Sequence, residues 1–306
     1  MKVGCIDIGT NSMRLLLANY KDDNITDRKK YVNSTRIGQG VDDKGFIKDS
    51  AMKINIDALK EYKKICDENN CDKVFCIGTS ALRDAKNSDE FIYLAKKEAN
   101  IDVEIITGED EAYLGFNGVL QGIKEKENIL VIDIGGGSTE FIFGDECNIK
   151  FSKSEDIGAV RMTERFLNGS LSKDLEIIEM DKYINEKIDE TVKTIKKYNI
   201  NKVIGIGGTA TSISAINQEL EVYSMEKIHN SIITLDEVKK ILHKIKNMTL
   251  NDKKRVKGLQ EKRADIIVAG VEILYIIMKN LEIDSITVSE YDNLEGLVHK
   301  KMGKMS

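Results

Sequence analysis

Two short segments of the chain combine an aspartate with a glycine-containing turn and could bind phosphate. The first reads Asp7-Ile8-Gly9-Thr10-Asn11-Ser12, and the second reads Asp133-Ile134-Gly135-Gly136-Gly137-Ser138-Thr139. Glycine lets the backbone approach a ligand closely, and successive backbone N–H groups in such a turn can hold an anion. One such turn is typical of an ordinary hairpin, but two copies that each follow an apolar run ending in aspartate favour phosphate binding. The predicted phosphate-binding residues here are Gly9, Thr10, Asn11, Ser12, Gly135, Gly136, Gly137, Ser138 and Thr139.

The two aspartates themselves indicate a divalent cation. Asp7 and Asp133 each end an apolar run that predicts a buried strand. A carboxylate in such a place is costly unless it is paired or binds a cation. Mg²⁺ is typically held by one or two carboxylates together with substrate phosphates and water. We therefore predict Asp7 and Asp133 as metal ligands, the alternative being that each aspartate only caps the turn that follows it.

The elements that position these residues occur twice in the sequence. Residues 3–18 match residues 129–144, and residues 74–81 match residues 203–210 in the same order and at nearly the same spacing. In each copy a meander of strands precedes helices that alternate with further strands, which predicts a mixed sheet covered by helices. The expected strands include 25–37, 74–78, 102–106, 147–154, 202–206 and 284–288, and the expected helices are 51–69, 88–99, 109–123, 158–167, 173–197, 209–217, 235–247, 261–280 and 292–303. We predict two domains, residues 1–124 and 125–291, with a C-terminal helix at about 292–306 packing on the first domain and the active site in the cleft between them.

Composition and charge exclude several other classes of protein. Of the 306 residues 41% are hydrophobic and 32% are charged, and the net charge is −5, which argues against a disordered chain or a nucleic-acid coat protein. No apolar run reaches the ~20 residues of a membrane span, and the first apolar run contains an acid and lacks a signal-peptide cleavage site. We therefore expect a cytoplasmic protein without nucleic-acid or membrane partners.

Cys66, Cys71 and Cys76 do not have the spacing of a zinc ribbon, so the cysteines are expected to be buried, reduced thiols.

The ordered set of motifs resembles the exopolyphosphatase/guanosine pentaphosphate phosphohydrolase (Ppx/GppA) family. Each motif alone is weak, but together they run in order over essentially the whole chain. The segments that carry the resemblance are residues 6–14, 35–40, 78–87, 106–112, 133–140, 158–164, 207–210 and 263–267.

This resemblance implies an α/β protein with a duplicated actin-like (ribonuclease H-like) ATPase-superfamily fold. It implies an exopolyphosphatase, a hydrolase that releases orthophosphate from the end of inorganic polyphosphate with Mg²⁺ or another divalent cation as cofactor. By the same resemblance Glu111 is the general base and Glu140 is the second catalytic carboxylate. The further phosphate-binding residues that it implies are Arg14, Arg83, Gly207, Gly208 and Arg263, with Arg36 and Arg161 as weaker candidates.

Several alternatives stay open at this stage. Guanosine pentaphosphate presents the same terminal phosphoanhydride as polyphosphate, so its hydrolysis is the nearest rival. A non-catalytic sensor and a kinase of the same superfold are more distant rivals.

The sequence departs from the usual family pattern at two positions. Leu294 stands where the family usually has arginine, and Val268 where it usually has proline. The long family members carry further C-terminal domains, so we do not expect processive action on very long chains. The basic run at residues 253–257 is expected to be a solvated helix face. A homodimer is an open alternative that the sequence does not decide.

Overall fold

The computed structural model describes residues 1–167 and 174–303, apart from the side chains of residues 42 and 43. The chain divides into two compact units. Unit 1 comprises Met1–Gln121 together with Asp292–Ser306, and unit 2 comprises Gly122–Tyr291. In the part of the chain that is described, no helix is both long and apolar enough to span a membrane.

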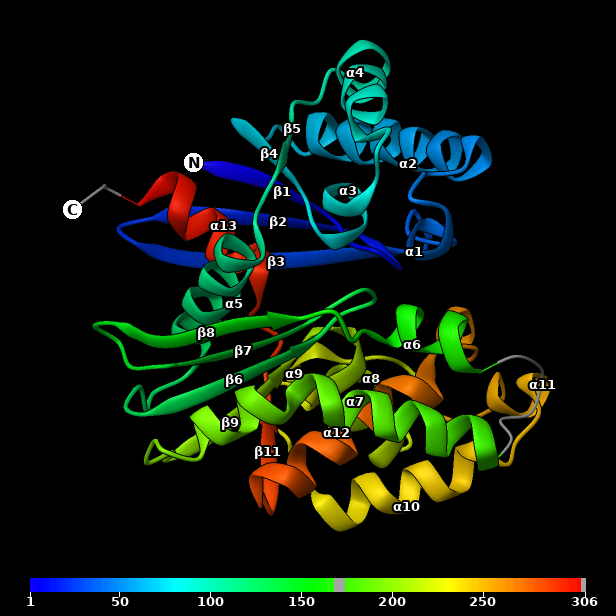
Figure 1. Ribbon diagram of the computed structural model, residues 1–306. Coiled ribbons are helices and arrows are strands. Elements are labelled where there is room, and N and C mark those ends of the chain that lie inside the picture. The colour runs from blue at the N-terminus through cyan, green and yellow to red at the C-terminus, as the bar shows by residue number, and fades with distance from the viewer. Residues whose placement is uncertain (168–173, 304–306) are drawn as a thin grey trace. The chain divides into compact units, whose positions relative to one another are not determined.

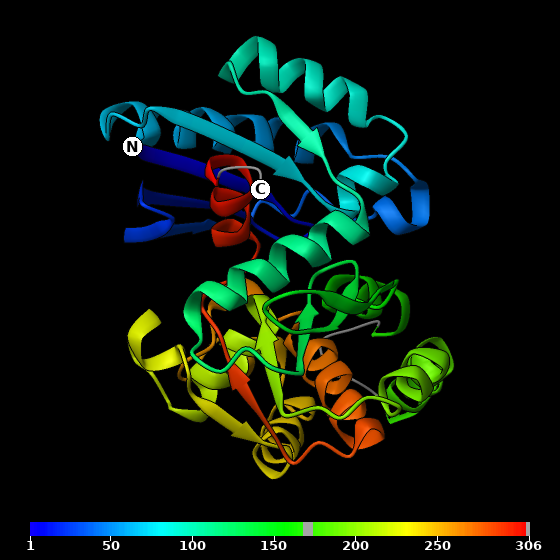
Figure 2. The same ribbon diagram turned by 90° about the vertical axis from the view of Figure 1, so that its left-hand side faces the viewer.

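Unit 1 is a five-stranded sheet with helices on both faces (Figure 1). The strand order is β3-β2-β1-β4-β5, in which β1 pairs antiparallel with β2 and parallel with β4. One face packs on α2 and α4, while the other packs on α13, as Figures 1 and 2 show. The elements are β1 (Lys2–Ile8), β2 (Met13–Lys21), β3 (Asn24–Asn33), α1 (Val41–Lys44), α2 (Asp49–Glu68), β4 (Lys73–Gly78), α3 (Ser80–Asp84), α4 (Ser88–Ala99), β5 (Val103–Ile105), α5 (Gly108–Gly122) and α13 (Asn293–Met302).

Unit 2 repeats this sheet with one additional edge strand. Its order is β10-β11-β9-β6-β7-β8, so that β6, β7, β8 and β9 correspond to β1, β2, β3 and β4. The match confirms that the fold is duplicated. The elements are β6 (Ile129–Ile134), β7 (Thr139–Gly144), β8 (Ile149–Glu155), α6 (Ala159–Phe166), α7 (Asp174–Ile195), β9 (Lys202–Ile206), α8 (Gly207–Asn217), α9 (Met225–Ile228), β10 (Ile232–Thr234), α10 (Leu235–Lys246), α11 (Leu250–Lys253), the 3₁₀ turn Glu261–Arg263, α12 (Ile267–Leu281) and β11 (Ser285–Val288).

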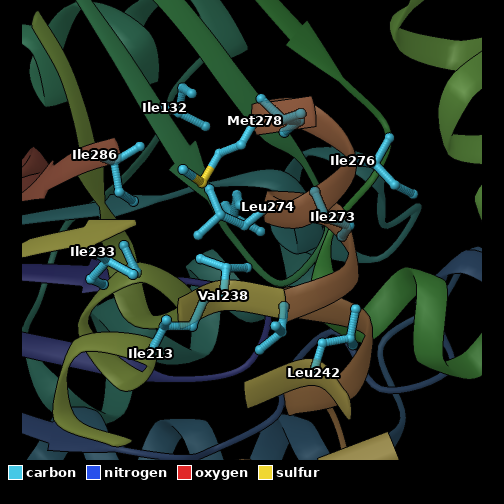
Figure 3. Packing of buried hydrophobic residues seen from close by; sticks show 14 of the residues in the cluster. Ile132, Ile213, Ile233, Val238, Leu242, Ile273, Leu274, Ile276, Met278 and Ile286 are labelled. Carbon is cyan, nitrogen blue, oxygen red and sulfur yellow. The ribbon is translucent and has the colours of Figure 1, made fainter. Parts of the chain in front are cut away.

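The core of unit 2 is built around α12, whose side chains are apolar almost all round. Leu274 and Met278 of this helix pack with Ile132 of β6 and Ile286 of β11, as Figure 3 shows. A helix that is hydrophobic on most of its surface must be buried. This burial fixes the sheet that carries the second glycine turn.

The structure corrects some of the predicted elements. The helix expected at 261–280 begins at Ile267, because residues 261–263 form a separate 3₁₀ turn. The third strand of unit 1 ends at Asn33 instead of residue 37. The start of the helix expected at 173 lies outside the described residues. The cysteines are free, but Cys147 is exposed in the turn between β7 and β8 and Cys71 is half-buried, so the expectation of burial is wrong for these two.

Candidate active site

The two glycine turns have the same backbone geometry. In the turn from β1 to β2 the Gly9 N–H donates to the Ser12 carbonyl at 3.1 Å, and in the turn from β6 to β7 the Gly135 N–H donates to the Ser138 carbonyl at 3.0 Å. Both turns join antiparallel strands whose apolar residues are buried. The sequence repeat therefore produces two equivalent turns at the ends of two buried strands.

The residue across from each strand-end aspartate differs between the two units. Arg14 lies directly opposite Asp7 on β2, and Glu140 lies directly opposite Asp133 on β7. Opposed residues of an antiparallel pair have Cβ atoms about 4.5–5.5 Å apart. Unit 1 therefore pairs an acid with a base, whereas unit 2 places two acids side by side.

In unit 1, Asp7 takes part in a buried ion-pair network. Arg14 donates to Asp7 and, at 2.7 Å, to Asp292 at the start of α13. Lys30 lies 3.3 Å from Asp292 and 3.1 Å from Glu295. Burial alone would raise the pKa of Asp292, but Arg14 and Lys30 together lower it to about 2. Arg14, predicted to bind phosphate, thus lies between two carboxylates, and the second oxygen of Asp7 is buried without a hydrogen-bond partner among the described residues.

The first glycine turn also carries an unsatisfied amide. The side chain of Asn11 is 6% exposed, and neither its oxygen nor its nitrogen has a hydrogen-bond partner in the described part of the chain. Buried polar groups are normally paired, so an unpaired amide beside an anion-binding turn fits a bound ligand. The segment 35–38 lies against this turn, since the Arg36 N–H donates to the Asn11 carbonyl at 3.0 Å.

Glu111 is distinguished from its acidic neighbours by burial. It lies in the first turn of α5 and is 8% exposed, whereas Glu109 is exposed and Asp110 pairs with Lys300 at 2.7 Å. Arg83 lies 3.3 Å from Glu111 and also donates to the Ile106 carbonyl at 3.0 Å. The structure therefore brings together two of the predicted site residues, a buried acid and an arginine held at a fixed place.

In unit 2 the second turn, Asp133 and the start of α8 lie together. Asp133 and Glu140 are both buried, and Ser154 of β8 donates to Glu140 at 2.7 Å. Gly207 has a φ of +77°, and a Cβ there would lie 2.2 Å from the Asp133 carboxylate. Any side chain at position 207 would thus fill the space beside that carboxylate.

Two further cationic residues of unit 2 lie against glycine-containing segments, Arg263 at the start of α8 and Arg161 at the second glycine turn. A Cβ at Gly208 would lie 2.0 Å from a guanidinium nitrogen of Arg263, so this arginine covers the start of α8. Arg161 donates to the Gly137 carbonyl at 2.7 Å, and α6 contributes backbone N–H bonds to the carbonyls of Gly135 and Gly136. Thr139, predicted to bind phosphate, donates its hydroxyl to the Ile157 carbonyl in the interior.

The carboxylates fit a hard cation of the Mg²⁺ type better than a fully protein-bound metal. Within the described residues no group of three or more histidines, cysteines or acids is arranged to hold a metal. Mg²⁺ needs only one or two protein carboxylates, because water and substrate phosphates complete its shell. Two adjacent carboxylates repel one another, and a cation between them removes that cost. Asp133 and Glu140 therefore fit such an ion.

Three residues beside the candidate site residues, Ser154, Asp292 and Glu295, were not predicted from the sequence. Ser154 carries no recognisable signal, but Asp292 and Glu295 form a capping box that the spacing Asp-x-x-Glu does indicate. Leu294 is fully buried in the apolar cluster of unit 1 formed with β1 and β2. An arginine at this position would have to bury its charge there.

Comparison with known proteins gives the following matches. A model of the Ppx/GppA phosphatase family matches residues 17–305. The bifunctional 3-dehydroquinate synthase/phosphatase of Fusobacterium nucleatum is 40% identical over 96% of this chain, which spans only 45% of the length of that relative. The exopolyphosphatase 2 of Mycobacterium tuberculosis is 30% identical, with 97% of each chain covered. The crystal structure of an exopolyphosphatase from Cytophaga hutchinsonii is 31% identical with a TM-score of 0.90, and the match covers 98% of this chain and 97% of that one. These likenesses confirm the duplicated actin-like fold.

Proposed function

Since the chain belongs to the Ppx/GppA phosphatase family, we propose that it is an exopolyphosphatase that hydrolyses the terminal phosphoanhydride of inorganic polyphosphate and releases orthophosphate. The observation that carries the proposal is the pair Asp133 and Glu140, two buried acids across neighbouring strands beside a glycine turn. Adjacent acids suit a divalent cation, and the turn suits phosphate. Phosphoanhydride hydrolysis requires both a bound cation and a site that holds the phosphate.

Asp133 and Glu140 would hold the cation, and Ser154 would keep Glu140 in position. A bound Mg²⁺ would neutralise the charge on the phosphate oxygens. Asp7 was also predicted as a ligand. Arg14 already compensates the charge of Asp7, so we assign the cation to Asp133 and Glu140 instead.

Glu111 is proposed as the general base that deprotonates the attacking water. A base of this kind must be ionised, and a neighbouring arginine favours the ionised form of a carboxyl group. Arg83 meets that requirement at 3.3 Å, and its second bond to the Ile106 carbonyl keeps it in place. The N–H groups of Gly9 and Gly135 are bonded within their own turns, so the other backbone N–H groups of these turns and the Asn11 amide would bind phosphate oxygens.

The test compares three substrates side by side in the presence of Mg²⁺. Orthophosphate release is measured from short polyphosphate, long polyphosphate and guanosine pentaphosphate. We expect polyphosphate to be hydrolysed with the higher kcat/KM. Faster release from guanosine pentaphosphate would assign the chain to the other activity of the family, and binding without release from any of the three would identify a sensor.

The role of Glu111 is tested with a matched pair of variants. Glu111→Gln keeps the size of the side chain and removes its basicity, so kcat should fall at least ~100-fold. Glu109→Gln makes the same change at an exposed position of the same helical turn and should leave kcat unchanged. Normal turnover by Glu111→Gln, together with an inactive Glu140→Gln, would show that the assignment of the two roles is wrong.

A further inference from the structure

The end of α2 brings two cysteines together through its backbone geometry. After Glu68 the chain turns at Asn70, whose φ is +52°. The Cys71 N–H donates to the Cys66 carbonyl at 3.0 Å, and the Asn70 N–H donates to the Asp67 carbonyl at 2.9 Å. These two bonds define a Schellman motif, in which the residue two positions beyond the helix cap packs against the helical residue three positions before it. Here those two residues are Cys71 and Cys66.

The two thiols lie close together and differ in their access to solvent. The Cys66 and Cys71 side chains lie close enough for each to affect the pKa of the other. A Cβ at Gly4 of β1 would lie 2.5 Å from the Cys66 sulfur and 3.7 Å from the Cys71 sulfur, so both sulfurs lie over this glycine. Cys66 is fully buried, whereas Cys71 is half-buried. A solvent-borne oxidant can therefore reach the Cys71 sulfur first, whereas the Cys66 sulfur is shielded from solvent.

We propose that Cys66 and Cys71 form a disulfide when a hydroperoxide oxidises the folded protein. The Cys71 sulfur attacks the peroxide oxygen, which gives a sulfenic acid at Cys71 and one water when hydrogen peroxide is the oxidant. The Cys66 sulfur then attacks the Cys71 sulfur, and the sulfenic hydroxyl leaves as a second water. In total two thiols lose two electrons and two protons to one peroxide, which becomes two waters.

The surroundings of the pair predict how its rate depends on pH. Burial raises the pKa of Cys66 to about 12 and also raises the pKa of Cys71, while the neighbouring Cys66 thiol and Lys2 oppose the shift at Cys71. The thiolate is the reactive form, and little of it is present at neutral pH. Oxidation should therefore be slow at pH 7 and faster at higher pH.

Proteolysis reports the disulfide directly, because trypsin leaves both cysteines in one peptide. Cleavage after Lys64 and Lys73 gives residues 65–73, while Cys76 falls in residues 74–83 and the exposed Cys147 in residues 127–150. The full chain is treated with hydrogen peroxide, free thiols are blocked with N-ethylmaleimide, and the digest is analysed by mass spectrometry without reduction. We expect peptide 65–73 without a maleimide group and lighter by two hydrogen atoms than the reduced peptide.

Variants separate this pair from other thiols of the chain. Cys76→Ser should leave the modified peptide unchanged, and Cys71→Ser should abolish it while Cys66 stays reactive towards maleimide after unfolding. Cys66→Ser should leave a sulfenic acid at Cys71 that dimedone traps. A cross-link between peptides 65–73 and 74–83, or full maleimide labelling of peptide 65–73 after prolonged peroxide treatment at high pH, would overturn the proposal.

Discussion

Replacement of Glu272 by glutamine should change how the stability of the protein depends on pH. Glu272 is 4% exposed in the apolar helix α12, and when protonated it donates a hydrogen bond to Asp181 of α7. Burial, and then the charge of Asp181, raise the pKa of Glu272 from an ordinary value of 4.5 to about 8, while Lys246 opposes the shift. Burial also raises the pKa of Asp181, against the bond from Glu272 and the charges of Lys279 and Lys246.

The sign follows from the protons bound in each state. Between pH 4.5 and about 8 the unfolded chain is ionised at Glu272, whereas the folded chain keeps the proton. The folded state then binds more protons, so stability falls as the pH rises through this window. Each pH unit lowers the free energy of unfolding by up to ~1.4 kcal/mol, and the whole window from pH 4.5 to about 8 lowers it by at most about 5 kcal/mol. Glutamine carries no titrating proton and can still donate a hydrogen bond to Asp181. The loss of stability with rising pH should therefore disappear in this variant.

Urea unfolding followed by circular dichroism at several values between pH 5 and pH 8 measures the effect. The free energy of unfolding of Glu272→Gln should be close to that of the wild type at pH 5 and should exceed it increasingly towards pH 8. Glu179→Gln, an exposed acid on the same helix as Asp181, serves as the control and should follow the wild type throughout. A constant difference between Glu272→Gln and the wild type across this range would refute the reasoning.

Three further predictions concern the site and its support. Excess chelator, or Asp133→Asn, should abolish phosphate release, and undiminished hydrolysis in chelator would exclude the proposed cation. Arg83→Ala removes a charge-assisted bond to Glu111 and should lower kcat and raise KM in a salt-dependent way; unchanged kinetics would make Arg83 purely structural. Gly296→Ala should destabilise the protein by about 1–3 kcal/mol, since its Cβ would lie 1.9 Å from the Leu114 carbonyl of α5, and an unchanged melting temperature would contradict this close contact.

The duplicated fold could be predicted because its signals are local. Apolar runs, glycine turns and helical spacing recur in the same order in both halves of the chain. The short elements α1, α9, α11 and β10 were missed, because three or four residues do not establish a period. The helix predicted from residue 261 begins later. The apolar residues before Ile267 continue the helical pattern in the sequence, but residues 261–263 form a separate 3₁₀ turn.

The candidate site was less accessible to sequence reasoning because its contacts join distant residues. The acids at 109–111 all suit a helix N-terminus, and only the packing of α5 shows that Glu111 alone is buried. The pairing of Arg14 with Asp292 depends on the return of the chain to unit 1, which no local pattern reveals. Arg14 and Glu140 occupy matching positions of the sequence repeat. Alignment of the two copies alone therefore predicts that one aspartate has a basic neighbour and the other an acidic one.

The return of the chain to unit 1 also constrains the order in which the protein can mature on the ribosome. Leu294 and Leu297 of α13 cover one apolar face of the first sheet, and Asp292 balances the charges of Arg14 and Lys30. All of residues 122–291 must be synthesised before α13 exists. Until then a nascent chain exposes that sheet face and lacks part of its ion-pair network, whereas unit 2 is complete in sequence as soon as residue 291 has been added. Although domains generally fold first at the N-terminal end during synthesis, here we expect the second unit to reach its native core before the first.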